Sequence, residues 1–122
     1  MKIFISQPLS GIPEELAKQK RLEAEDNIRS MLDSSDIEFL HHTEDIAPDD
    51  VENKRVWYLG QSISIMAQAD YIVFMPGWEN AFGCIIEHYI AKLYGFKIIN
   101  PITAESYMNC LKKTVDSIED ML

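Results

Sequence analysis

The fold is decided by one stretch of sequence, Met75-Pro76-Gly77-Trp78-Glu79-Asn80-Ala81-Phe82-Gly83-Cys84-Ile85-Ile86-Glu87-His88. The stretch completes an apolar run that starts at Tyr71 and is typical of a buried strand. It leads into a helical pattern formed by Ile86, Ile90 and Leu93. We therefore expect a strand, a loop containing Pro and Gly, and a helix that carries a glutamate in its first turns. In an open α/β sheet, ligands bind at the edge where strands end and helices begin.

The rest of the chain repeats the alternation of strand and helix. Apolar runs predict strands over residues 3–6, 37–40, 71–75 and 96–100, and helical periodicity predicts helices over about 13–32, 56–67, 83–94 and 108–122. Short connections between such elements imply a parallel sheet with right-handed crossovers. We expect a single α/β domain over residues 1–122. Its predicted architecture is a flavodoxin-like three-layer sandwich with a parallel sheet of four to five strands, in the order 2-1-3-4 or 2-1-3-4-5.

This strand order brings two loops together. Strands 1 and 3 would lie side by side, so the loops Gln7–Ile12 and Pro76–Phe82 would face each other at the edge where the strands end. The sequence therefore predicts one site built from both loops.

Composition limits the classes of partner. The chain has 122 residues and a formal net charge of −9, which argues against a nucleic acid polymer but not against a single nucleotide. Its two cysteines, Cys84 and Cys110, form no C-x-x-C pair, so we expect a reducing cytoplasmic setting. The apolar run Met1–Ile5 is too short for a signal peptide or a membrane span, and no membrane partner is expected.

The loop after the first strand is a candidate for binding an anion. It reads Ser6-Gln7-Pro8-Leu9-Ser10-Gly11, and its hydroxyls and backbone N–H groups could hold a phosphate or a sugar hydroxyl. The alternative is an ordinary turn in which Gly11 supplies a positive φ and Ser10 caps the helix, and the sequence alone favours this turn. Glu14 and Glu15 already occupy the positive end of that helix dipole.

Glu87 is the candidate catalytic residue. It lies three residues before Ile90, so its side chain borders the buried stripe of the helix. A carboxylate there can attack an electrophilic sugar carbon or act as a general base, and Glu79 and His88 are candidates for proton transfer. The alternative is a glutamate on the helix surface.

Three other features have simpler explanations. Cys84 and His88 could form a nucleophilic pair, but such a cysteine is more often a small packed residue. The segment His41–Asp50 holds histidines and carboxylates in no ligand spacing, so it predicts a polar loop and no metal site. Trp78 could stack on a nucleobase or cover the strand end.

Two motifs carry a family resemblance: Lys2-Ile3-Phe4-Ile5-Ser6-Gln7-Pro8-Leu9-Ser10-Gly11, and the Gly77-Trp78-Glu79-Asn80, Gly83-Cys84 and Glu87-His88 set. Together they resemble the small, often phage- or prophage-borne, nucleoside 2-deoxyribosyltransferase-like proteins. The resemblance implies cleavage or transfer at the N-glycosidic bond of a (deoxy)nucleoside or nucleoside monophosphate. In the reaction that the resemblance implies, Glu87 forms a covalent glycosyl-enzyme intermediate and no cofactor is needed. The resemblance also implies a homo-oligomer, a dimer or larger.

The resemblance also assigns binding residues and exposes two departures. Ser6, Gln7, Pro8, Ser10 and Gly11 would line the sugar or phosphate side, and Gly77, Trp78, Asn80 and Gly83 the base side. An Asp that assists the leaving base in the relatives falls at about Ser62, and a substrate-binding Ser or Asp falls at Ala81. These departures keep open an alternative: a non-catalytic protein that binds or sequesters a nucleotide through a degenerate site.

Overall fold

The computed structural model describes residues 1–32, 36–41 and 45–99 of the chain. It is an α/β fold whose four strands are all parallel, in the predicted order β2-β1-β3-β4. The strands are β1 (Lys2–Ser6), β2 (Glu38–Leu40), β3 (Tyr71–Phe74) and β4 (Lys97–Ile99). The helices are α1 (Glu14–Leu32), α2 (Lys54–Met66) and α3 (Phe82–Leu93), with a short 3₁₀ helix, η1 (Trp78–Asn80), before α3.

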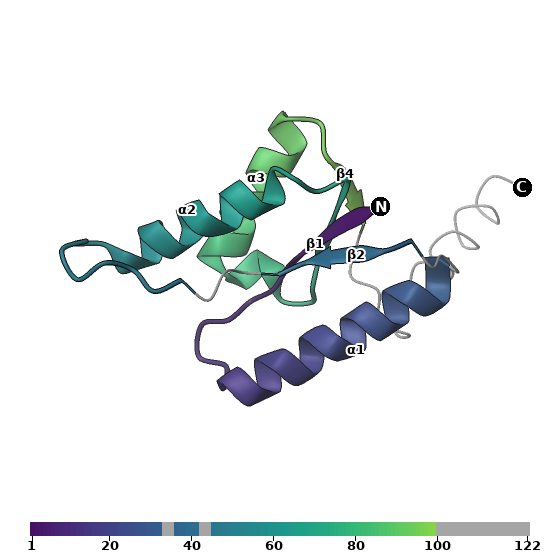
Figure 1. The fold of residues 1–122 in the computed structure, drawn as a ribbon, viewed down its shortest axis with the longest axis horizontal. Helices are drawn as coiled ribbons and strands as arrows, with labels where there is room; N and C mark the ends of the chain where they lie inside the picture. The colour runs from purple at the N-terminus through teal and green to yellow at the C-terminus, as the bar shows by residue number, and fades with distance from the viewer. Residues whose placement is uncertain (33–35, 42–44, 100–122) are drawn as a thin grey trace, which may run out of the picture.

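The sheet lies between two helical layers. Figure 1 shows α1 on one side of the strands and α2 and α3 on the other. Successive residues of β1 pack on opposite faces of the sheet, because side chains alternate in direction along a strand. Ile3 and Ile5 pack in the core cluster that contains Ile28 of α1, whereas Phe4 packs in the cluster that contains Met66 of α2 and Ala91 of α3.

The two central strands are apolar because both of their faces are covered. Four of the five residues of β1 and three of the four residues of β3 are buried. Their parallel pairing sets Ile3 opposite Tyr71 and Ser6 opposite Phe74. The N–H of Met75 then donates to the carbonyl of Ser6 at 3.0 Å, just beyond the last pair. The carboxyl ends of β1 and β3 therefore meet at one edge of the sheet.

Local signals explain where the helices begin and end. Asn53 caps α2, because its side chain accepts a hydrogen bond from the N–H of Val56 at 3.0 Å. The helix therefore starts at Lys54, two residues before the apolar position from which periodicity predicts it. After α3, Gly95 has a φ of 73°, the left-handed conformation expected of the residue that ends a helix.

Periodicity predicts only part of the side of α3 that meets the sheet, where Ile90 packs against the core cluster of Phe4 and Ala91. Ile86, Ile90 and Leu93 form the apolar pattern in the sequence, yet Ile86 is 42% exposed and Leu93 is 64% exposed. The buried residues of α3 are Cys84, Glu87 and Ala91. Because α3 is apolar around most of its circumference, spacing alone cannot say which side meets the sheet.

Other boundaries and predictions differ in detail. The loop predicted over residues 76–82 contains η1, and the described part of the fourth strand is Lys97–Ile99, so it starts one residue later than predicted. The helix predicted over residues 108–122, any fifth strand there and Cys110 lie outside the described residues. Across the described ranges, no helix combines the length and the apolar character needed to cross a membrane.

Burial predicts a large difference between two identical substitutions. Ile72 is fully buried in β3, whereas Ile46 is 83% exposed in a loop. We expect Ile72→Ala to lower the free energy of unfolding by ~2–5 kcal/mol, because it leaves a cavity between sheet and helices. Ile46→Ala should change it by no more than ~0.5 kcal/mol. Urea denaturation of both variants measures this, and equal losses would contradict the described packing.

Candidate functional site

The loops that follow β1 and β3 meet at the carboxyl edge of the sheet. Gly77, in the second loop, has a φ of 90°, and a Cβ placed on it would lie 3.8 Å from Cγ of Pro8 in the first loop. The positive φ requires glycine or strains any other residue. The strand order thus brings together the two segments from which the sequence predicts a site.

Glu87 lies on the inner side of α3, the helix that follows the second of these loops. Its side chain is buried with only 6% exposed, close to Ser6 at 1% and Cys84 at 3%. Neither Oε2 of Glu87 nor Oγ of Ser6 has a hydrogen-bond partner among the described residues. Buried polar atoms in folded proteins are nearly always paired. The two atoms therefore leave hydrogen-bonding capacity that a ligand could use.

Burial changes the acidity of Glu87. Loss of solvent raises the pKa of this carboxyl from 4.5 to about 7, and the nearby hydroxyl of Ser6 lowers it in part. The hydroxyl acts through its proximity, since it lies outside full hydrogen-bond geometry. At neutral pH the carboxyl is therefore divided between its ionised and protonated forms.

Cys84 lies close to Glu87 and Ser6 and is a protonated thiol. Burial raises the pKa of Cys84 from 9.0 to about 11, the Ser6 hydroxyl lowers it, and the charge of Glu87 raises it further. A thiol with this pKa is almost wholly protonated at neutral pH, and the thiolate is the nucleophilic form. The structure thus favours the packed role of Cys84 over the catalytic one.

His88 stacks on Trp78 beside the site. Their ring centroids are 4.1 Å apart with an interplanar angle of 18°, and both rings also contact Phe74. Burial and Lys92 lower the pKa of His88, while Glu79 raises it. The neutral imidazole can accept a proton. One face of the Trp78 indole is covered by His88, so Trp78 closes the strand end as well as bordering the site.

The remaining predicted binding residues are exposed or contact other parts of the fold. Gln7 Nε2 donates to the carbonyl of Ala17 at 2.7 Å, which ties this loop to α1. Ser10 and Gly11 are exposed, and Gly11 has the positive φ of the turn that the sequence favours. Asn80 is exposed at the end of η1. A Cβ on Gly83 would make ordinary van der Waals contact, at 3.9 Å, with Cδ1 of Leu59, so Gly83 lies against α2.

A second polar pair lies between α1 and β2, and the sequence pattern does not predict it. Glu25 of α1 is buried, and its Oε1 lies 2.8 Å from Nε2 of His41 at the end of β2. One feature of the sequence could have indicated that Glu25 is buried. Glu25 directly follows Ala24, which lies on the side of α1 that packs against the sheet. His42 and Glu44 of the predicted polar loop lie outside the described residues. Within the described ranges, no three His, Cys, Asp or Glu side chains gather to hold a metal ion.

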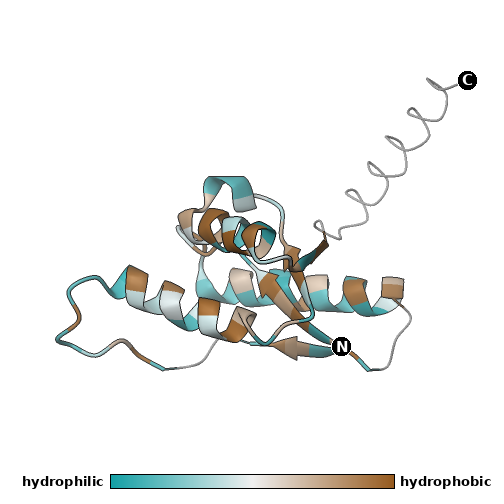
Figure 2. Cartoon of the chain, turned by 90° about the horizontal axis from the view of Figure 1, so that it is seen from above, coloured by the Kyte–Doolittle hydropathy of each residue, from teal (hydrophilic) through white to brown (hydrophobic). Residues whose placement is uncertain are grey.

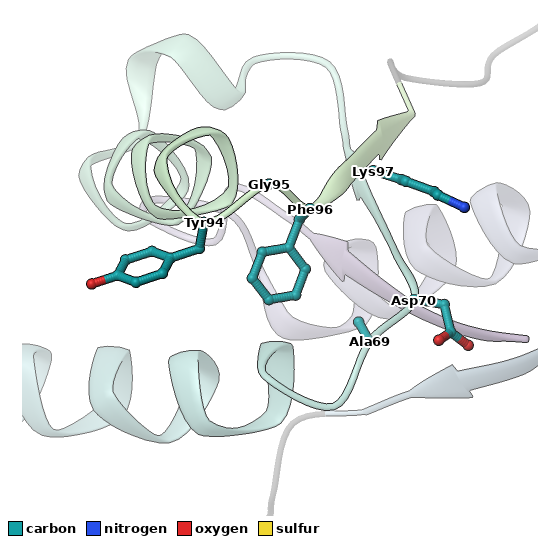
Figure 3. Close-up of a pocket in the computed structure, with 6 residues that line it drawn as sticks. All are labelled: Ala69, Asp70, Tyr94, Gly95, Phe96 and Lys97. Atoms are coloured by element: carbon teal, nitrogen blue, oxygen red, sulfur yellow. The ribbon is translucent and has the colours of Figure 1, made fainter.

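A surface hollow lies at the opposite edge of the sheet. It has a volume of about 340 Å³ and is lined by the six residues in Figure 3: Ala69, Asp70, Tyr94, Gly95, Phe96 and Lys97. Five of these residues directly precede β3 or β4 and Lys97 begins β4, whereas Glu87 lies on α3, which follows the carboxyl end of β3. Asp70 Oδ2 already accepts a hydrogen bond from the N–H of Lys2 at 2.8 Å. The hollow is therefore separate from the candidate site.

Comparison with known proteins places most of the chain in one family. A family model described as a domain of unknown function, DUF4406, matches residues 1–100. The chain belongs to the DUF4406 family. No curated protein and no solved structure matched it. Every described strand and helix lies within the DUF4406 match, so the loops and Glu87 are part of the family domain.

The raised pKa of Glu87 predicts a specific dependence of stability on pH. In the folded DUF4406 domain this carboxyl keeps its proton up to about pH 7. In the unfolded chain the carboxyl releases the proton near pH 4.5, its usual pKa. Its contribution to stability is therefore fully present below pH 4.5 and is lost as the pH rises toward 7.

Glu87→Gln should remove this loss. Between pH 5 and pH 8, the difference in unfolding free energy should move in favour of the variant by up to ~3 kcal/mol. Urea denaturation at several pH values measures it, with the exposed substitution Glu38→Gln as control. A constant difference across this range would show that Glu87 is not buried as an acid.

Cys84 should react slowly in the native protein. With Cys110→Ser in place, Cys84 is the one remaining thiol of the sequence. Because burial raises its pKa to about 11, we expect alkylation by iodoacetamide at pH 8 to be at least ~100-fold slower than in urea. Labelling followed by mass spectrometry checks this, and equal rates would place the thiol at the surface.

Proposed function

We propose that this DUF4406 protein cleaves or transfers at the N-glycosidic bond of a nucleoside or nucleoside monophosphate, with Glu87 as the nucleophile. One observation supports the proposal above the others. Glu87 is a buried carboxyl with an unpartnered oxygen, next to the unpartnered hydroxyl of Ser6, at the sheet edge where ligands bind in such folds. The motifs shared with nucleoside 2-deoxyribosyltransferase-like proteins point to the same residue.

The proposed reaction has two displacements. A carboxylate oxygen of Glu87 bonds to the anomeric carbon, and the bond from that carbon to the base nitrogen breaks with its electron pair going to the base. The base takes up a proton and leaves. Water or a second base then attacks the same carbon, releases Glu87 as a carboxylate, and gives overall retention, as in retaining glycosidases.

The environment of Glu87 suits this chemistry. A pKa of about 7 leaves a useful fraction ionised at neutral pH, while the same burial keeps water from solvating the nucleophile. The sugar ring gains positive charge in the transition state, and this charge favours the ionised carboxylate. With Glu87 only 6% exposed, side chains around it must move for a sugar to reach the carboxyl group.

The neighbours of Glu87 take supporting roles in the proposal. The hydroxyl of Ser6 donates to a sugar hydroxyl, and the base lies toward Trp78. Glu79 and His88 protonate the leaving base. The charge of Glu79 favours the protonated, imidazolium form of His88. Ser62, buried in α2, has no acidic group for this task. We also propose a cytoplasmic setting, which the free buried thiol of Cys84 supports.

A second function is favoured by the residues at the start of α3. Ala81 occupies the N-cap position and offers no side-chain hydrogen bond, so the first N–H groups of α3 lack a capping side chain. Together with Ser62, this favours a protein that binds or sequesters a nucleotide without turning it over. Such a protein would bind its ligand at the same residues but would leave the glycosidic bond intact.

The two functions are separated by one assay. The full-length protein is incubated with a panel of deoxynucleosides and nucleoside monophosphates, and released base is measured by chromatography. We expect release by the wild type, a loss of at least ~10³-fold in Glu87→Gln, and wild-type activity in Glu38→Gln. Thermal stabilisation by a nucleotide without base release would instead establish the binding function.

The pH dependence of the same reaction tests the role of Glu87 further. If the ionised carboxyl attacks, kcat/KM should rise with pH to a plateau, with a midpoint near pH 7 that belongs to the free enzyme. The measurement is the initial rate at low substrate concentration between pH 5 and pH 9. A rate that falls across this range would assign Glu87 the role of an acid.

A further inference from the structure

The outer side of α3 is apolar. Phe82 is 84% exposed, Ile86 42%, Tyr89 65% and Leu93 64%. At about 100° per residue, these four positions lie opposite Cys84, Glu87 and Ala91, which face the sheet. A helix that covers a sheet normally presents polar residues outward. Figure 2 shows hydrophobic colour over much of the ribbon of α3. We call these four residues the α3 outer face.

The patch around this face is large. Ile85, 40% exposed, and Tyr94, 77% exposed, extend it on one flank and at its end. Each aromatic residue can contribute ~150–250 Å² of surface when it is buried. The side chains of the α3 outer face, which follow one another at intervals of three and four residues, thus offer several hundred Å² of apolar surface. Patches of this size on soluble proteins mark sites of interaction, whereas singly exposed apolar residues need no explanation.

The spacing of the α3 outer face is symmetric. The intervals between Phe82, Ile86, Tyr89 and Leu93 are four, three and four residues, the spacing by which helices pack side by side. Reading the helix backwards gives the same intervals. Two copies of α3 placed antiparallel would therefore set Phe82 against Leu93 of the second copy, and Ile86 against Tyr89 of the second copy. A surface that matches itself in this way suits a twofold interface.

Charge at the two ends of α3 favours the same pairing. Glu79 is exposed just before the helix begins, and Lys92 is exposed in its last turn. In an antiparallel pair, each Lys92 approaches Glu79 of the second copy. The one acidic residue within α3 is Glu87, which faces inward. The chain carries a net charge of −9, so two copies meet with the least repulsion on a side without carboxylates.

We propose that two copies of this chain form a twofold dimer through the α3 outer face, with their α3 helices antiparallel. The proposal does not depend on the proposed function, because the interface lies on the side of α3 opposite Glu87. It assigns a role to apolar side chains that the sheet, α1 and α2 leave uncovered.

The test is the oligomeric state of the full-length protein in solution, measured by sedimentation velocity between 1 and ~100 μM. We expect a dimer for the wild type and a monomer for Leu93→Glu and for Tyr89→Glu, with circular dichroism unchanged. Leu22→Glu is the matched control, since Leu22 is 46% exposed on α1 and lies outside the interface. This variant should remain a dimer.

A charge exchange tests the antiparallel arrangement without altering the apolar contacts. Lys92→Glu should weaken the dimer by ~3–10-fold, because two like-charged contacts replace two attractive ones. The double variant Lys92→Glu with Glu79→Lys should return to the wild-type dissociation constant. A double variant as weak as the single one would overturn the antiparallel pairing.

Two results would overturn the dimer itself. The first is a wild-type protein that stays monomeric at ~100 μM, as it would if residues 101–122 covered α3 in the same chain. The second is a dimer that survives Leu93→Glu and Tyr89→Glu but dissociates with Val115→Glu. Val115 belongs to the apolar pattern of residues 108–122, so this result would assign the interface to the C-terminal segment instead.

Discussion

The parallel pairing of β1 with β3 is the constraint on which the rest of the structure depends. It sets Ser6 opposite Phe74 and is extended by the hydrogen bond from Met75 to Ser6. Because side chains alternate along a strand, this arrangement turns Ser6 toward α3 and Gln7 toward α1. A slip of one residue would exchange them and place an amide beside Glu87. The chemistry of the site thus follows from a pattern of backbone hydrogen bonds.

The same arrangement explains why the site is costly to maintain. Glu87 is held among buried groups with an unpaired oxygen, next to a thiol and a hydroxyl that cannot neutralise its charge. A glutamine or leucine there would fold more easily at neutral pH. Unpaired polar groups of this kind cluster where proteins bind or transform ligands. The burial of apolar side chains in β1 and β3 offsets the cost of burying Glu87, since nearly all side chains of these two strands are buried.

Sequence reasoning succeeds where one signal dominates. The apolar runs of β1 and β3 predict buried parallel strands, and their order predicts the meeting of the two loops. Sequence reasoning fails to identify the buried side of α3. Apolar residues occupy both sides of this helix, so the helical period of the apolar residues does not distinguish the two sides. The stacking of His88 on Trp78 and the pairing of Glu25 with His41 also escape it. Each depends on side-chain positions that the spacing of residues does not determine.

The edges of the described sheet have a consequence for how the protein avoids misassembly. β2 and β4, the outer strands of the part of the sheet that the structure describes, each comprise three described residues, and each begins with an exposed charged residue, Glu38 or Lys97. Short, charged edges are poor templates for strands of another molecule. Open-ended growth of fibrils through backbone pairing is therefore discouraged even at high concentration, despite the apolar interior of the sheet.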